Sequence, residues 1–160
     1  GLLLPEDWRA RFPVAADGPM LGAHSGAGRY FMLRAARRRK LYDELVESEL
    51  TAYLQSVERA FDLVVCADTL CYFGALESVF AAVVQALRPG GRFLFSVEHW
   101  PPNDARGFRI QSSGRYRHTT AYVRESLELA GLAVTAIDEL VLRQEAGDAV
   151  AGLLVEAVTA

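Results

Sequence analysis

Acidic and imidazole side chains follow two apolar runs in the second half of the chain, and these residues could do chemistry. Asp68 ends the run 61–68, and Glu98 and His99 end the run that begins at Arg92. Both runs are short and rich in apolar residues, which is typical of strands buried on both faces of a parallel sheet. The carboxyl ends of such strands meet at one edge, where open α/β sheets bind their ligands. The sequence therefore predicts a ligand site beside these three residues.

Two of these side chains have alternative interpretations. Asp68 could contact a ligand or orient its reacting group, or it could cap the helical segment that begins at Thr69. His99 is a candidate general base because an imidazole titrates near neutral pH. It could instead be an ordinary loop histidine, which is the commoner role of a single histidine in a loop, and both alternatives stay open.

The segment 99–119 is a predicted loop, and loops of this length in compact domains are often functional. Its Arg115, Tyr116 and His118 could form a lid or contact a substrate. They could equally cap the helix that is predicted after Thr119.

Periodicity predicts the elements that must position these residues. Apolar residues recur at helical spacing over 76–87, and Pro89 and the glycines after it should end that helix. A strand, a helix and a second strand then form a right-handed parallel unit. A helix is predicted over 121–130, followed by strands over 133–142 and 150–158 that form a hairpin. The expected class is an α/β fold whose last strand pair is antiparallel.

Composition narrows the function classes. The chain has 160 residues, is 51% apolar and 23% charged, and carries a formal net charge of -3. This composition excludes intrinsic disorder, and the mildly acidic balance makes nucleic acid an unexpected partner. No apolar run approaches the roughly 20 residues of a membrane span. Cys66 and Cys71 are expected to be reduced thiols, which favours a cytoplasmic protein.

Other reaction classes lack their motifs. The three histidines are scattered and neither cysteine has a metal ligand at a suitable spacing, so no metal site is expected. Neither a nucleophile elbow nor a phosphate-binding loop is present. The basic run 34–40 is interpreted as a solvated helix face, or as a contact for an anionic acceptor such as RNA.

The motifs of residues 61–98 also carry a resemblance to a known family. The run 61–70, the Leu-Arg-Pro-Gly-Gly-Arg sequence at 87–92 and the strand end 96–98 resemble the class I S-adenosylmethionine-dependent methyltransferases in order and spacing. Residues 113–118 and the closing hairpin are similar to bacterial members, so that the resemblance spans about 41–158. It implies a Rossmann-like, mostly parallel sheet with helices on both faces and a C-terminal antiparallel hairpin. It also implies S-adenosylmethionine as cofactor and a small molecule or protein side chain as methyl acceptor.

The resemblance further implies which residues form the site. The cofactor would lie across the carboxyl ends of the first and fourth strands, and Phe73 could line its pocket or pack in the core. The residues expected to contact it near the fourth strand are Cys66, Ala67, Asp68, Leu70 and Tyr72. Methyl transfer needs a positioned acceptor and at most one proton acceptor. The catalytic candidates are Asp68, Glu98, His99 and His118.

The family also implies a glycine-rich loop after its first strand. The nearest candidate is the stretch 20–29, in which Gly26 and Gly28 could approach the cofactor. Gly22 replaces the usual acid of this motif and His24 replaces a usual glycine. A flexible surface loop is the alternative interpretation of this stretch.

The N-terminal half is short for this fold. Residues 20–61 number 42, whereas three strands with their helices and loops need on the order of 70. At least one strand–helix crossover is therefore expected to be missing or shortened.

Two placements of this shortened half compete. In the first, 32–37 is a helix, 42–46 is the third strand and Glu49 faces the adenine amine. In the second, Glu47 or Glu49 binds the ribose, about 20 residues after the glycines. Local propensity favours neither placement, because 41–59 could form one continuous helix.

These observations predict a single domain over 1–160. It would comprise an extension (1–19), a shortened cofactor-loop half (20–60) and a complete C-terminal half (61–160). The predicted function is methyl transfer to a small molecule or protein. The alternative is a non-catalytic scaffold or partner-binding module that has lost the cofactor. Such a module would expose a sheet edge and associate with itself or with a partner, so a homodimer is a possible state. The chain could also be part of a longer protein.

Overall fold

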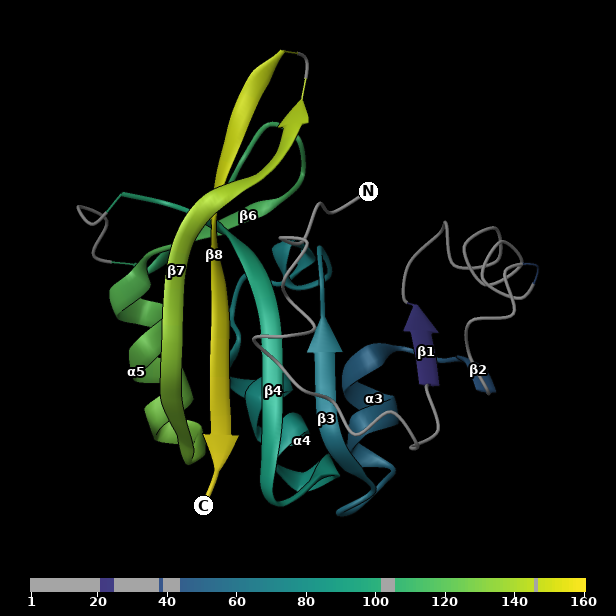
Figure 1. Ribbon diagram of the computed structural model, residues 1–160. Helices are drawn as coiled ribbons and strands as arrows, with labels where there is room; N and C mark the ends of the chain where they lie inside the picture. The colour runs from purple at the N-terminus through teal and green to yellow at the C-terminus, as the bar shows by residue number, and fades with distance from the viewer. Residues whose placement is uncertain (1–20, 25–37, 39–43, 102–105, 146) are drawn as a thin grey trace.

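The main sheet combines parallel and antiparallel strands. The computed structural model describes residues 21–24, 38, 44–101, 106–145 and 147–160. Its main strands, in spatial order, are β3 (Phe61–Cys66), β4 (Leu87–His99), β8 (Asp148–Thr159) and β7 (Leu132–Glu145) (Figure 1). β3 runs parallel to β4, whereas β8 runs antiparallel to both β4 and β7. The predicted α/β class with an antiparallel last pair is confirmed.

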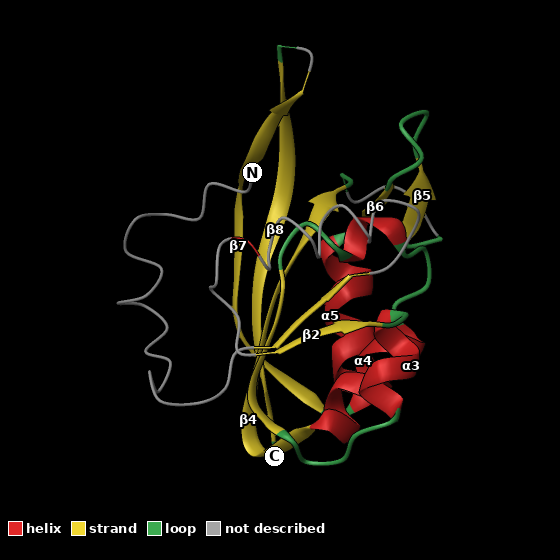
Figure 2. Cartoon of the chain, turned by 90° about the vertical axis from the view of Figure 1, so that its right-hand side faces the viewer, coloured by secondary structure: helices red, strands yellow, loops and turns green. Residues whose placement is uncertain are grey.

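The α-helices of the described residues lie on one face of this sheet (Figure 2). They are α3 (Leu50–Gln55), α4 (Glu77–Ala86) and α5 (Thr120–Ala130). Phe80 of α4 is fully buried against Phe93 and Phe95 of β4, with ring centroids 5.7 and 5.3 Å apart. Its position reflects the helical spacing of apolar residues, which predicted this helix. The helix layer expected on the second face is not among the described residues.

The second face of the sheet is apolar at its centre. Leu94 and Leu154 are buried there, and Leu63 and Leu140 pack against them. Side chains alternate between the faces of a strand. Residues 96 and 98 of β4 therefore share the face of Leu94, whereas Val97 and His99 share the helix-covered face.

The segment predicted as a loop contains a small hairpin. β5 (Phe108–Ile110) and β6 (Tyr116–His118) pair in antiparallel fashion, and β6 also runs parallel to the end of β4. Strands of this length carry too little periodicity to be recognised in the sequence. The helix after it matches its prediction, since the Thr119 hydroxyl caps its first turn and Gly131 ends it in a left-handed conformation.

The C-terminal hairpin is longer than predicted. β7 continues past residue 142 and β8 begins before residue 150. The tip of this hairpin projects beyond the end of β4 (Figure 1). Arg143, predicted to lie in the turn, is instead a strand residue that pairs with Val150 beside a register shift.

The described part of the first half contains a separate pair of parallel strands, β1 (Leu21–His24) and β2 (Glu44–Glu47). The alternative of one continuous helix over 41–59 is wrong, because β2 lies within this segment and α3 starts only at Leu50. The physical reason is Glu49, whose carboxylate accepts hydrogen bonds from the backbone of Thr51 and Ala52 and caps α3. The parallel pairing of β1 with β2 is compatible with both predicted placements of the first half. The predicted helix over 32–37 lies outside the described residues.

Within the described residues, no helix is long and apolar enough to cross a membrane.

Candidate functional site

The carboxyl ends of β3 and β4 meet at one edge of the sheet, as predicted. Asp68 follows β3 and has a left-handed backbone with φ of 51°, a conformation that Asp adopts more readily than most residues. Its backbone N–H donates to the Ser96 hydroxyl of β4 at 3.0 Å, and Ser96 is buried. The neighbouring strand therefore stabilises the turn that presents Asp68.

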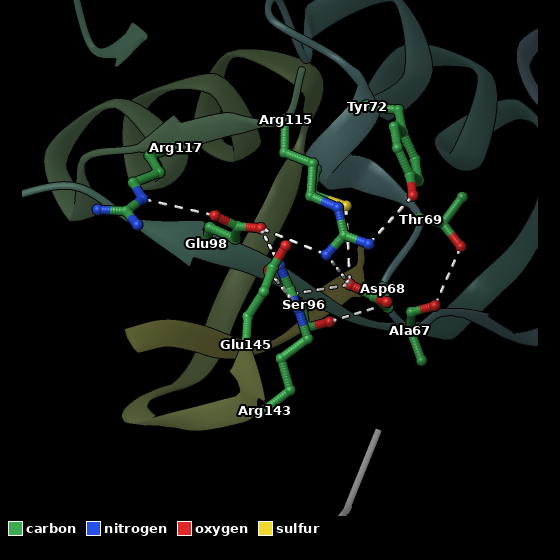
Figure 3. Close-up of polar contacts among 11 residues, drawn as sticks. Ala67, Asp68, Thr69, Tyr72, Ser96, Glu98, Arg115, Arg117, Arg143 and Glu145 are labelled. Carbon is green, nitrogen blue, oxygen red and sulfur yellow. Dashed lines mark hydrogen bonds and ion pairs between the residues drawn. The ribbon is translucent and has the colours of Figure 1, made fainter. Parts of the chain in front are cut away.

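Glu98 is the most deeply buried acid at this edge. Its side chain is only 3% exposed, and a buried carboxylate is stable only when it is paired. Arg143 Nη2 lies 2.5 Å from Glu98 Oε1, Arg117 Nε lies 3.4 Å from Oε2, and Arg115 Nη1 lies 3.6 Å from Oε1. Guanidinium groups from β7 and from the β5–β6 hairpin thus converge on one carboxylate (Figure 3).

Arg143 connects the two acids. Its Nη1 lies 3.2 Å from Asp68 Oδ1, and its Nη2 binds Glu98 and also lies 2.9 Å from Glu145 Oε2. Burial alone would lower the pKa of Arg143, but the hydrogen bonds to Glu98 and Glu145 outweigh it and raise that pKa. Arg143 therefore remains charged throughout the physiological range.

Arg115 lies between the two acids and an aromatic ring. Its Nη1 is 3.7 Å from Asp68 Oδ1, and its Nη2 donates to the Tyr72 hydroxyl at 3.3 Å. The guanidinium also stands 5.5 Å from the centre of the Tyr72 ring, a distance at which cations and aromatic rings attract. Tyr72 is 58% exposed, so this ring forms part of the surface beside the acids.

The predicted catalytic residues divide between the two faces of the sheet. Asp68 and Glu98 are brought together by Arg143, whereas His99 lies on the helix-covered side. His99 Nε2 is 3.3 Å from the Thr120 hydroxyl, and its Nδ1 is 3.9 Å from Glu139 Oε2. Its contacts are thus with the start of α5 and with β7, away from the arginine cluster.

His118 is completely buried, and its Nε2 lies 3.0 Å from the Gly74 carbonyl oxygen. Its ring stacks on Tyr122 at a centroid distance of 5.9 Å. Burial lowers the pKa of His118, although the backbone carbonyls of Gly74 and Phe73 partly oppose this shift. A neutral imidazole packed in this way supports the turn around Gly74.

The structure separates the predicted cofactor residues by exposure. Cys66 and Leu70 are buried in the core, and burial raises the pKa of the Cys66 thiol to about 12. Ala67, Asp68 and Tyr72 remain at the surface. The cofactor could therefore reach Cys66 and Leu70 only through their backbone, whereas the other three offer side chains as well.

The remaining predicted cofactor residues lie on the first half of the chain. Gly26 and Gly28 are outside the described residues. Glu49 is exposed at the start of α3, where burial alone would raise its pKa but several hydrogen bonds, mostly from backbone N–H groups, together outweigh it and lower that pKa. The placement of Glu49 against adenine or ribose stays a prediction.

Two of the alternative interpretations are wrong. Asp68 does not cap the segment after it, because that segment, η1 (Leu70–Tyr72), has Thr69 as its N-cap residue and no side-chain cap. The Asp68 carboxylate faces arginines and the Cys71 thiol instead. At α5 the cap is the Thr119 hydroxyl, so none of Arg115, Tyr116 and His118 fulfils that role.

Sequence reasoning missed Arg143, Arg117 and Glu145. Arg143 and Glu145 are alternate residues, but a register shift between Val141 and Arg143 means that the strand period alone would not have placed them on the face of Glu98. The polar turn-like composition of 143–148 also concealed that the strand continues to Glu145. Within the described residues, no cluster of three His, Cys, Asp or Glu side chains could hold a metal ion.

Comparisons with known proteins agree with this geometry. Residues 30–95 match a family model described as a methyltransferase domain. The fold resembles that of a SAM-dependent methyltransferase from Methanosarcina mazei, with 13% identity, a TM-score of 0.64 and coverage of 87% of this chain and 81% of that one. It also resembles an S-adenosylmethionine-dependent methyltransferase from Mesorhizobium loti, with 23% identity, a TM-score of 0.59 and coverage of 86% and 79%.

Part of the chain also matches a curated protein whose name is not that of a methyltransferase. A phosphoheptose isomerase from Helicobacter hepaticus is 31% identical over 91 residues, which is 57% of this chain and 39% of that protein. The chain thus spans well under half of that relative's length.

The sheet and its carboxyl-edge site define a Rossmann-like fold of the class I methyltransferase type. Together with the methyltransferase-domain match, this fold supports the class I S-adenosylmethionine-dependent methyltransferase family for the chain. The cofactor that this family implies is S-adenosylmethionine. The described residues fit it, because the end of β3 offers the exposed Ala67 and Tyr72 and a half-exposed Asp68 carboxylate for a cationic ligand.

Proposed function

We propose that this protein transfers the methyl group of S-adenosylmethionine to a small molecule or a protein side chain. The observation that carries the proposal is the methyltransferase-domain match over residues 30–95, combined with a partly exposed acid at the end of β3. The sulfonium of the bound cofactor supplies the electrophilic methyl group. The protein has to hold the acceptor in line with it and to exclude water.

Asp68 is the residue proposed to hold the cationic amino-acid end of the cofactor. Its carboxylate is 34% exposed even though Arg143 and Arg115 contact it. The left-handed turn, which Ser96 supports, keeps this carboxylate at the surface. Glu98 is too buried to meet the cofactor directly, and we assign it the role of fixing the arginines around the acceptor.

Calorimetric titration with S-adenosylmethionine and S-adenosylhomocysteine tests this proposal. Asp68→Asn should weaken binding of either ligand at least about tenfold, which corresponds to one charge-assisted hydrogen bond. Asp62→Asn is the matched control, because Asp62 lies at the opposite end of β3 and is 76% exposed. It should bind like the wild type. Absence of heat and of thermal stabilisation with millimolar ligand would overturn the proposal.

A second candidate function is a non-catalytic, partner-binding module. It is favoured by one observation: among the described residues, no hydrogen-bonded strand pair joins β1 and β2 to the main sheet. Such a module should form a homodimer or hold a partner through an open sheet edge. Sedimentation velocity decides this point, since a strictly monomeric protein that binds S-adenosylhomocysteine would exclude the module. A cytoplasmic location is part of the main proposal and rests on the two reduced cysteines.

A further inference from the structure

The β5–β6 hairpin gathers arginines that the neighbouring acids do not saturate. Arg109 and Arg117 are directly opposite each other in the antiparallel register of this hairpin. Like charges in a cross-strand pair destabilise it. Arg109 lies over the Trp100 ring at 5.4 Å, which lessens this repulsion without neutralising either charge. A pairing that costs stability at the edge of a ligand site calls for a functional reason.

Arg115 and Arg117 keep unused hydrogen-bond donors. A guanidinium carries five N–H donors in a planar fork. Arg115 donates one hydrogen bond, to the neutral Tyr72 hydroxyl, and stands 3.6 and 3.7 Å from Glu98 and Asp68. Arg117 makes one 3.4 Å contact, to Glu98. Arg143, by contrast, binds these two acids and Glu145, so the acids are largely occupied by Arg143.

The charged side chains at this edge of the sheet also favour an anionic ligand. Among the described residues, Arg115, Arg117 and Arg143 contact Asp68, Glu98 and Glu145, so these six charges balance. Arg109, opposite Arg117 on the neighbouring strand, adds one further positive charge to this edge. Arg115 and Arg117 are alternate residues of one extended segment, so they point to the same face about 7 Å apart. Both side chains are partly exposed, at 20% and 35%. Each guanidinium already has one side on the Glu98 carboxylate, and the donors that remain on the two forks can together hold one further group with several anionic oxygens.

We propose that Arg115 and Arg117 bind an anionic oxygen group, a carboxylate or a phosphate, of the molecule that this protein methylates. That the bound anion belongs to the methyl acceptor rests on the proposed function. Anion binding itself does not, because the anion can bind without the cofactor. It places the anionic end of the acceptor beside Tyr72 and Asp68. The reacting atom of the acceptor would then face the carboxyl ends of β3 and β4. The acceptor class is thereby narrowed to organic acids and phosphate esters.

Thermal unfolding without any cofactor tests the anion site. Sodium phosphate and sodium acetate are compared with sodium chloride at equal ionic strength, for the wild type, Arg115→Gln/Arg117→Gln and Arg124→Gln. Arg124 is an exposed arginine of α5 and serves as the matched control. Phosphate or acetate at about ten times its Kd should raise the Tm of the wild type and of the control by roughly 3–6 °C. The double variant should lose this shift while keeping any general salt effect.

The outcomes are distinct. A shift with phosphate alone identifies a phosphate ester as the acceptor class, and a shift with acetate alone identifies an organic acid. A wild-type response no larger than that in chloride, or an equal response in the double variant, would overturn the proposal. If the double variant does not fold, Arg117→Gln alone replaces it, because Arg117 makes a single long contact. Failure of S-adenosylhomocysteine to bind would instead count against the proposed function and leave the anion result standing.

Discussion

The guanidinium of Arg143 lies 3.2 Å from the carboxylate of Asp68, although the two residues are 75 positions apart in the chain. This contact ties the C-terminal hairpin to the end of β3, where the cofactor is proposed to bind. The same guanidinium holds the buried Glu98 at 2.5 Å. The hairpin is therefore a structural part of the site as well as the edge of the sheet.

Arg143→Met should destabilise the protein by about 2–3 kcal/mol. The substitution keeps most of the apolar stem but leaves Glu98, whose side chain is 3% exposed, with only the longer contacts to Arg115 and Arg117. Loss of one partner of a buried ion pair costs about 3–5 kcal/mol, and the two remaining arginines reduce that cost. Urea unfolding measures the change.

The exposed pair of Arg88 and Asp62 provides the control for this prediction. It has the same 2.5 Å separation, but its side chains are 50% and 76% exposed. Arg88→Met should cost no more than about 0.5–1 kcal/mol, because water screens exposed pairs. Equal losses in the two variants would show that the burial of Glu98 does not control the stability of this edge.

The second half of the fold could be predicted because its elements carry their own signals. The apolar run before Asp68 predicts a buried strand, and the apolar stripe that contains Phe80 predicts a helix with one buried face. The glycine after α5 marks the end of that helix. A strand of three residues such as β6 spans too few positions to show a period. Its existence depends on pairing with the distant end of β4.

The arginine cluster could not be predicted for a related reason. Asp68 and Glu98 were recognised because each follows a clear strand, so the topology alone places them at one edge. Arg143 reaches them only because β7 continues beyond its expected end and shifts register after Val141. His99 and His118 were grouped with the acids by sequence proximity, but alternation along β4 and β6 places them on the opposite face.

Gly152→Ala should lower stability by about 1–3 kcal/mol through overpacking. A Cβ at this position would lie 2.2 Å from Leu142 Cδ1 and 2.8 Å from the Val97 carbonyl oxygen. Leu142, whose side chain packs over Gly152, is itself buried. Adding Leu142→Ala should recover part of the loss, so that the double variant is more stable than the sum of the single changes predicts. Chemical unfolding of the three variants measures this coupling, and strict additivity would contradict it.

Neither cysteine should react with a thiol reagent while the protein is folded. Cys66 and Cys71 are buried, and burial raises the pKa of each thiol to about 12, so almost no thiolate is present at pH 8. Labelling with a chromogenic disulfide at pH 8 should proceed at least about a hundredfold more slowly in buffer than in denaturing urea. Rapid labelling of one thiol in the folded protein would show that the end of β3 opens locally.

The stability of the protein should fall as the pH decreases below about 6.5, and His118 should account for part of the loss. Burial lowers the pKa of His118 in the folded state, whereas an unfolded histidine titrates near 6.5. The unfolded chain therefore binds this proton first, and the folded state loses up to about 1.4 kcal/mol per pH unit until the lowered pKa is reached. His118→Gln does not titrate, and its amide can still donate to the Gly74 carbonyl. Urea unfolding at pH 7.5, 6.5 and 5.5 should show a smaller loss for this variant between the two lower values, and parallel curves for the two proteins would contradict the assignment.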